Sequence, residues 1–85
     1  MPTLTMFYGI IIRMYKRDHM PPHIHAEYQD DEACFDFDGN VLEGKLPPNK
    51  KKLVVAWISL HKDELTANWK LLQDGEKVCK IDPLK

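Results

Sequence analysis

Three histidines lie within seven residues of one another, at His19, His23 and His25. Residues two apart on a β-strand point to the same side, about 6.5 Å apart at Cα, so the rings of His23 and His25 can converge on one point. A loop held by the intervening Pro21-Pro22 can bring the third ring to the same place. Three imidazoles with one open position are a ligand set typical of zinc. The spacing therefore predicts a site for a divalent transition metal such as zinc.

Two acidic residues further along the chain extend this metal hypothesis. Asp36 and Asp38 are expected on the same sheet face as His23 and His25, because side chains of paired strands alternate between the two faces. Carboxylates in that position act as a fourth ligand or accept the hydrogen bond of the distal ring nitrogen. The predicted metal ligands are His19, His23, His25, Asp36 and Asp38.

Chemistry without a metal is compatible with the same histidines. A histidine oriented by a carboxylate can act as a general acid or base, and Arg13 can direct positive charge toward a phosphate. Arg13, His23 and His25 would then be the catalytic residues of a small metal-independent ribonuclease that uses the 2′-hydroxyl as nucleophile. Alternating polar residues are also the ordinary pattern of a solvated sheet face, and this interpretation stays open.

Other reactive side chains carry weaker signals. His61 lies within an apolar helical stripe, where a lone histidine is more often a core residue than a ligand. Trp57 and Trp69 are offset by about 120° on an ideal helix, so either one of them is exposed to a partner or both pack against the sheet. Nothing in the sequence around Cys34 marks it as an activated nucleophile, since it has no basic neighbour close in the chain.

The elements that must position these residues begin with strands. Met6–Tyr15 is rich in β-branched and aromatic residues and predicts one largely buried strand, with Arg13 on the side opposite Ile10 and Ile12. His23–Tyr28 and Ala33–Asp38 alternate with period two around four loop residues, which predicts a hairpin.

With Tyr28 opposite Ala33 in this hairpin, His25 faces Asp36 and His23 faces Asp38. A slip of two residues would change these partners and leave every side chain on its face.

A turn signal at Asp38-Gly39-Asn40 predicts a further strand over Val41–Leu46, with Leu42 and Leu46 on the apolar face and Glu43 on the face of Asp36.

A helical stripe follows, with Asn49 as the expected N-cap. Apolar positions recur at helical spacing over Lys50–Asp74, and Gly75 is well placed to end the helix. A straight helix of this length exceeds the width of so small a domain, which predicts a break near Ser59–Asp63. Lys77–Ile81 is a candidate short edge strand. The predicted fold is α+β, a small antiparallel sheet of three to five strands with one long or broken helix packed on one face.

Length and charge limit the function classes. With 85 residues and a formal net charge of −1, the chain is expected to form a single domain over residues 1–85. A general nucleic-acid binder is usually more basic, although Lys50, Lys51 and Lys52 cluster. The longest apolar run covers Met6–Ile12, far short of a membrane helix, so a cytoplasmic protein is expected.

The chain resembles a small bacterial family known as domain of unknown function 4160. The residues that carry the resemblance are Met6-Phe7-Tyr8-Gly9-Ile10, Asp18-His19-Met20-Pro21-Pro22-His23-Ile24-His25-Ala26, Trp57, His61, Glu64-Leu65 and Trp69. The resemblance implies a small stand-alone protein often encoded beside another short domain of unknown function, an arrangement described as a toxin-antitoxin pair. It implies a bacterial cytoplasmic setting and a second small protein as partner, and it supplies no catalytic residue.

Two hypotheses follow. The first is a partner-binding component of a two-protein regulatory, toxin-antitoxin-like module that docks through its helix or sheet edge. The second is a metal-dependent hydrolase or ribonuclease that uses the His19, His23 and His25 cluster. RNA is a further candidate partner, and an unpaired strand edge would allow a homo-oligomer.

Overall fold

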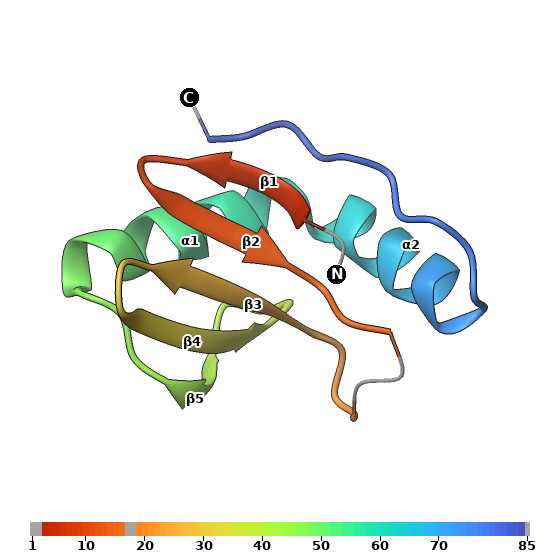
Figure 1. Cartoon of the computed structure of the whole chain (residues 1–85), viewed down its shortest axis with the longest axis horizontal. Helices are drawn as coiled ribbons and strands as arrows, with labels where there is room; N and C mark the ends of the chain where they lie inside the picture. The colour runs from red at the N-terminus through yellow and green to blue at the C-terminus, as the bar shows by residue number, and fades with distance from the viewer. Residues whose placement is uncertain (1–2, 17–18, 85) are drawn as a thin grey trace.

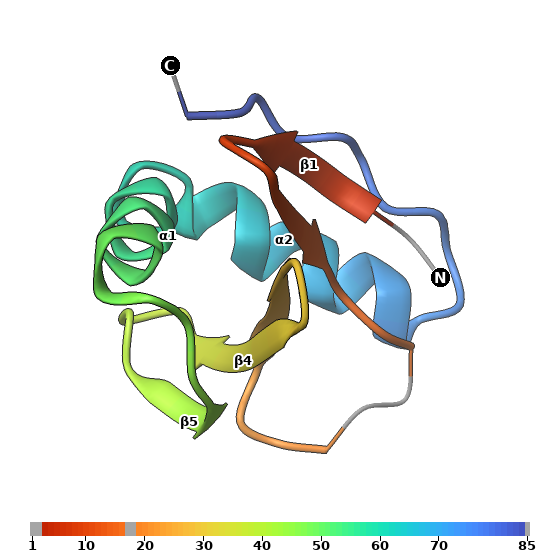
Figure 2. The same ribbon diagram turned by 60° about the vertical axis from the view of Figure 1, so that its left-hand side comes forward.

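The computed structural model describes residues 3–16 and 19–84, and within them it contains one five-stranded antiparallel sheet and two helices (Figure 1). The elements are β1 (Thr3–Phe7), β2 (Ile10–Arg13), β3 (His23–Tyr28), β4 (Asp31–Asp36), β5 (Val41–Gly44), α1 (Pro48–Leu60) and α2 (Lys62–Gln73). The strands follow one another across the sheet in chain order. Both helices lie on the same face of the sheet, as Figure 2 shows. The predicted α+β class and the predicted helical break are confirmed. Arg17 and Asp18 lie outside the described residues, and Asp18 is the first residue of the segment Asp18–Ala26 that carries the family resemblance.

The core lies between the sheet and the helices. Alternate residues of the central strands point into it, among them Ile12, Ile24 and Phe35, which are completely buried. From the helices, Trp57 and Leu65 fill the opposite side and are equally inaccessible to solvent. This arrangement leaves the other sheet face, which carries Arg13 and His25, to the polar side chains. Neither α1 nor α2 in the described chain is long and apolar enough to cross a lipid bilayer.

The single strand predicted over Met6–Tyr15 is wrong, because the chain reverses within it. Tyr8 and Gly9 both adopt positive φ, 49° and 79°, and form the two-residue turn between β1 and β2. Such a turn matches the twist of an antiparallel pair, but it usually contains Asn or Asp before the glycine. Tyr8 is therefore exposed, whereas Ile10 and Ile12 are buried as their alternation predicts.

The β3–β4 hairpin is shifted by two residues from the predicted register. Its turn consists of Gln29 and Asp30, so that Tyr28 pairs with Asp31. His25 therefore lies opposite Cys34, and His23 lies opposite Asp36. The predicted pairs His25 with Asp36 and His23 with Asp38 are wrong, but each side chain keeps its predicted face because the shift is even.

β5 is shorter than the predicted Val41–Leu46. A bulge opposite Cys34 and Phe35 changes the alternation, so Leu42 is exposed and not part of the core as predicted. Leu46, which lies beyond the strand, is buried as predicted. Gly44 ends the strand with φ +77°, and a Cβ atom on it would lie only 2.2 Å from the carbonyl oxygen of Glu32.

The helices meet at His61, which caps the end of α1 and the start of α2. The predicted N-cap Asn49 is wrong, because α1 begins two residues earlier than predicted, at Pro48, with Pro47 in the cap position. After α2, Gly75 donates its N–H to the Leu72 carbonyl with φ +83°, which ends the helix as predicted.

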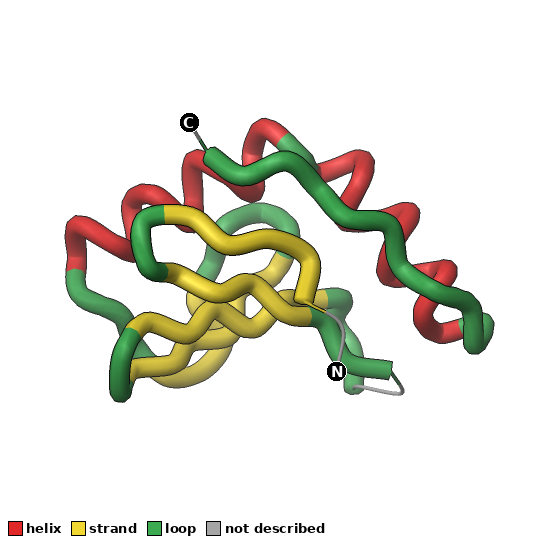
Figure 3. The backbone as a smooth tube through the Cα atoms, turned by 45° about the horizontal axis from the view of Figure 1, so that its top comes forward, coloured by secondary structure: helices red, strands yellow, loops and turns green. Residues whose placement is uncertain are grey.

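The segment from residue 76 to residue 84 runs back along α2 and β1 without forming a strand, as the tube in Figure 3 shows. The predicted edge strand Lys77–Ile81 is therefore wrong. Ile81 N–H does donate to the Leu4 carbonyl of β1, but side chains provide the other attachments. Asn68 exchanges two hydrogen bonds with the backbone of Cys79, and Trp57 Nε1 donates to the Asp82 carbonyl.

Candidate functional site

The structure places the three predicted histidines side by side. The rings of His19 and His23 are stacked with centroids 4.9 Å apart, and those of His23 and His25 are 5.1 Å apart. β3 positions His23 and His25, and the proline loop, which contains a cis Met20–Pro21 bond, positions His19. The predicted proximity of the three rings is therefore correct.

Nδ1 of His23 and Nδ1 of His19 each contact a backbone carbonyl oxygen of the proline loop. His23 is only 1% exposed, its Nδ1 lies 2.7 Å from the Pro21 carbonyl, and its ring packs against Trp69. His19 Nδ1 lies 3.2 Å from the Met20 carbonyl. A ring nitrogen that contacts a carbonyl oxygen must carry the proton, so Nε2 is the nitrogen of each of these rings that is left to a metal. Among the described side chains, no group of three His, Cys, Asp or Glu is arranged to hold a metal ion.

The two predicted carboxylates have other partners. Asp36 Oδ1 accepts hydrogen bonds of 2.9 Å from the N–H groups of Asp38 and Asn40, and its Oδ2 accepts one from the Asn40 amide. Burial alone would raise the pKa of Asp36, but these hydrogen bonds lower it below its ordinary value. Asp38 forms an ion pair with Lys62 at 2.5 Å. Both carboxylates therefore stabilise the β4–β5 turn and its contact with α2.

Arg13 lies on the histidine face, as its position in the alternation predicts. It is the cross-strand partner of His25 on the neighbouring strand. Its Nε donates to Glu27 Oε2 at 3.1 Å, and its Nη1 donates to the hydroxyl of Thr3. The guanidinium charge is therefore matched locally by Glu27.

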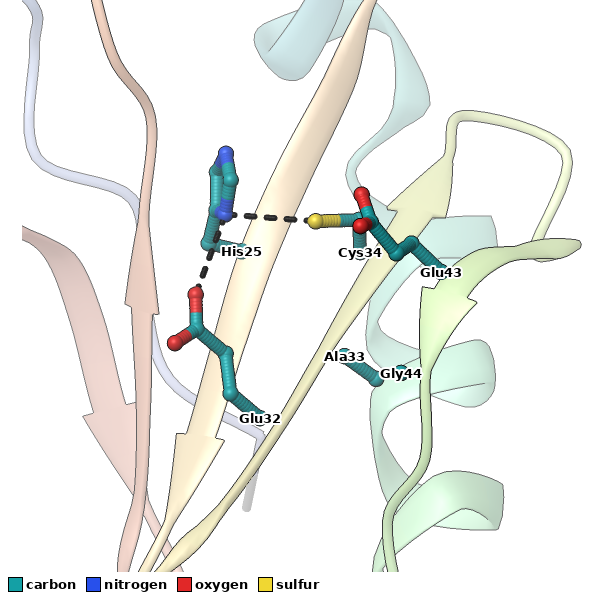
Figure 4. Close-up of a pocket in the computed structure, with 6 residues that line it drawn as sticks. All are labelled: His25, Glu32, Ala33, Cys34, Glu43 and Gly44. Carbon is teal, nitrogen blue, oxygen red and sulfur yellow. Dashed lines mark hydrogen bonds and ion pairs between the residues drawn. The ribbon is translucent and has the colours of Figure 1, made fainter.

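The same face contains a cluster that the sequence reasoning missed. Cys34 Sγ and Glu32 Oε2 each lie 3.2 Å from Nδ1 of His25, as the dashed lines of Figure 4 show. Tyr15 meets the imidazole edge-on, with ring centroids 4.4 Å apart. Sequence reasoning passed over Cys34 because the predicted register put Asp36 opposite His25. A two-residue turn at Gln29-Asp30 would have brought Cys34 to that position.

This cluster lies in a pocket of about 300 Å³ on the sheet face away from the helices. The residues that line it are His25, Glu32, Ala33, Cys34, Glu43 and Gly44. Burial, followed by the carboxylates of Glu27 and Glu32, raises the pKa of the neighbouring Tyr15, so its hydroxyl stays protonated at neutral pH. The pocket therefore combines a thiol, an imidazole and two carboxylates.

A second hollow, of about 450 Å³, lies on the outer face of α1. It is lined by Pro48, Lys51, Lys52, Val55 and Ala56, which recur at helical spacing. The apolar side chains form its floor, and the two lysines belong to the first turns of the helix, where no acidic residue is present.

The tryptophans and the last histidine pack within the molecule. Trp57 and Trp69 are both buried, so of the two sequence alternatives the structure has both packed against the sheet. His61 lies against Trp57 and forms a 2.6 Å contact with Glu64.

No curated protein and no solved structure matches the chain. The family model described as "Domain of unknown function (DUF4160)" matches residues 9–70. The match includes the proline and histidine segment, the β4–β5 hairpin, all of α1 and most of α2. Since it covers well over half of the 85 residues, the chain belongs to the family of the domain of unknown function DUF4160.

Proposed function

We propose that the protein is the partner-binding component of a two-protein regulatory module of the toxin-antitoxin type, and that it acts in the cytoplasm. The partner is a second small protein that docks on the outer face of α1. The observation that carries this proposal is the mostly apolar hollow of α1 that is lined by Pro48, Val55 and Ala56 together with Lys51 and Lys52.

The charge around this hollow favours an acidic partner. Lys51 and Lys52 lie in the first turns of α1, where the helix dipole already places partial positive charge. No side-chain cap and no acidic residue of the first turn offset that charge. An anionic group of a partner would therefore be attracted by the lysines and by the helix terminus together.

The apolar floor favours a protein over RNA. A peptide helix or strand can present an aliphatic side chain to Val55 and Ala56 while its carboxylates reach the lysines. An RNA strand would offer phosphates to the lysines but no aliphatic group to the floor. The formal net charge of the chain, −1, is also lower than that of most nucleic-acid-binding domains.

The hydrolase or ribonuclease alternative stays a prediction. His23 is buried with Nδ1 on a backbone carbonyl, and the carboxylates of Asp36 and Asp38 stabilise a turn and an ion pair. These contacts favour a structural role for His23, Asp36 and Asp38.

The proposal is tested with the product of the neighbouring gene, purified and titrated onto this protein by isothermal calorimetry. Ala56→Glu places a bulky negative charge in the hollow and is expected to weaken binding about tenfold or more, since it combines a steric block with charge repulsion. Lys52→Glu is expected to weaken binding in the same direction, and less so at high salt.

Ala67→Glu is the matched control, because Ala67 is also an exposed alanine within a helix, α2. It should bind like the wild type. Equal affinity of the Ala56→Glu and Ala67→Glu variants would contradict the proposed surface. Binding of a single-stranded RNA in place of the protein, sensitive to Lys52→Glu, would contradict the proposed class of partner.

A further inference from the structure

A further hollow adjoins the hollow of Lys51 and Lys52 on α1, which we name the lysine hollow. This turn hollow lies between α1 and the turn that joins β4 to β5, and it measures about 230 Å³. Its lining residues are Phe37, Asp38, Val55, Ile58, Ser59 and Lys62. Gly39 of the turn lies so close to the helix that a Cβ atom on it would be 3.2 Å from Cγ1 of Val55. Val55 also lines the lysine hollow, so the two hollows are neighbours along α1.

The spacing of the two hollows fits a helix and not a strand. The lysine hollow extends over Pro48–Ala56 and the turn hollow over Val55–Lys62, so their midpoints lie near Lys52 and Ser59. Seven helical residues rise by about 10 Å. In a second helix lying alongside, residues i and i+7 share one face at the same separation and reach both hollows. Side chains on one face of a strand are about 6.6 Å or about 13 Å apart and miss one of them.

The charges along this surface favour an acidic occupant with a defined direction. Lys51 and Lys52 lie at the N-terminal end of α1, where the helix terminus adds partial positive charge. At the other end, Lys62 is paired with Asp38 at 2.5 Å. Positive charge is therefore concentrated at the lysine hollow. Carboxylates and the partial negative charge of a helix C-terminus both gain there, which favours a helix antiparallel to α1.

The helices of a second copy of this chain do not supply such an occupant. The charged side chains of α1 are all lysines, so a second α1 would bring no carboxylate to the lysine hollow. α2 contains two leucines at the required spacing, Leu65 and Leu72, but both are buried against the sheet. A helix of another protein fits the surface better.

We propose that the docking element of the partner is an acidic amphipathic helix that lies antiparallel along α1. Two of its aliphatic side chains, seven residues apart, fill the two hollows, and carboxylates beside the C-terminal one reach Lys51 and Lys52. This inference rests on the proposed function, because it assumes a protein partner on α1. It adds the second point of contact and the form of the occupant.

Ser59 and Thr66 provide a matched pair of positions for the test. Both are exposed, and each hydroxyl donates to a carbonyl of the preceding turn, that of Ala56 or that of Lys62. Ser59→Trp fills the turn hollow and should weaken binding of the purified neighbouring gene product about tenfold or more in isothermal calorimetry. Thr66→Trp should bind like the wild type. Ser59→Glu, a smaller side chain at the same position, replaces Ser59→Trp if that variant fails to fold.

The outcomes separate this inference from the proposed function. Weaker binding of Ala56→Glu together with unchanged binding of the Ser59 variants would leave the proposed function standing and overturn the two-hollow occupant. Absence of binding to the wild type would overturn both. Dimerisation of this chain alone in analytical ultracentrifugation, lost in Ser59→Trp, would identify a second copy as the occupant and also overturn the inference.

Peptides of the partner test the form and direction of the occupant. Among overlapping peptides of about 20 residues, one acidic peptide should bind in fluorescence anisotropy and gain helical circular dichroism on binding. A nitroxide at its C-terminus should broaden the amide resonance of Lys52 more than that of Ser59, and a nitroxide at its N-terminus should do the reverse. A bound peptide without helical signal, or binding of the whole partner but of no peptide, would overturn the proposed helix. Broadening in the opposite order would overturn its direction.

Discussion

A single carboxylate, that of Asp36, organises the turn between β4 and β5. It accepts from two backbone N–H groups and from the Asn40 amide, which holds the chain reversal before β5. Because its pKa in the folded protein is lower than its ordinary value, its stabilising effect is full above the unfolded pKa of about 4. The effect is lost as the pH falls through the folded pKa.

Asp36→Ala is therefore expected to lower the free energy of unfolding by about 1 kcal/mol at pH 7, where several hydrogen bonds to a partly solvated charge are removed. The difference from the wild type should shrink below about pH 4. Urea denaturation across this pH range measures it. Asp38→Ala removes only an exposed ion pair and should change stability less; a larger effect at Asp38 would contradict this account.

At the scale of the strands and helices, two glycines allow the cost of a positive φ to be separated from the cost of a steric clash. Gly44 and Gly75 share nearly the same positive φ, 77° and 83°, which an L-residue rarely adopts. They differ in space, since a Cβ on Gly44 would lie 2.2 Å from the Glu32 carbonyl oxygen, and one on Gly75 would lie no closer than 3.7 Å to Lys16 Nζ.

Gly75→Ala should therefore cost about 1 kcal/mol from backbone strain alone. Gly44→Ala should cost about 3 kcal/mol, because β5 must also move away from β4. Thermal unfolding of the two variants provides the comparison. Equal losses would show that the clash with Glu32 is relieved without displacement of β5.

Sequence periodicity predicted most of these elements, and its errors have local causes. The helical region was predicted from the spacing of its apolar side chains, and its break from the length of that region. Its end was predicted from Gly75, since glycine readily adopts the positive φ that ends a helix. The errors at Tyr8 and Gln29 arise because residues that rarely adopt positive φ do so in two tight turns. The second of these turns decides that His25 lies opposite Cys34, so the contact between these two residues depends on a turn length that alternation does not encode.

At the scale of the whole molecule, the C-terminal segment fastens the sheet to the helices. Asn68 is 2% exposed, its amide donates to the Cys79 carbonyl at 2.9 Å, and its oxygen accepts from the Cys79 N–H at 2.8 Å. Asn68→Ala should lower the free energy of unfolding by about 2 kcal/mol, because two buried hydrogen bonds are lost. Chemical denaturation monitored by tryptophan fluorescence measures the loss.

Asn49→Ala is the matched control for this prediction, since Asn49 is exposed in the first turn of α1. It should change stability by less than about 0.5 kcal/mol. Similar losses for the two asparagine variants would mean that the bonds between Asn68 and Cys79 contribute little to the folded state.

The attachment of this segment also has a consequence for biosynthesis. The last strand and helix residue is Gln73, yet the indole N–H of Trp57 donates its hydrogen bond to the carbonyl of Asp82, nine residues later in the chain. While the chain is still being translated, this donor and the amide of Asn68 lack the partners that they have in the finished fold, and such unmet groups are costly inside a core. A nascent chain that ends before Asp82 is therefore expected to be less stable than the finished fold and to be recognised more readily by chaperones and proteases.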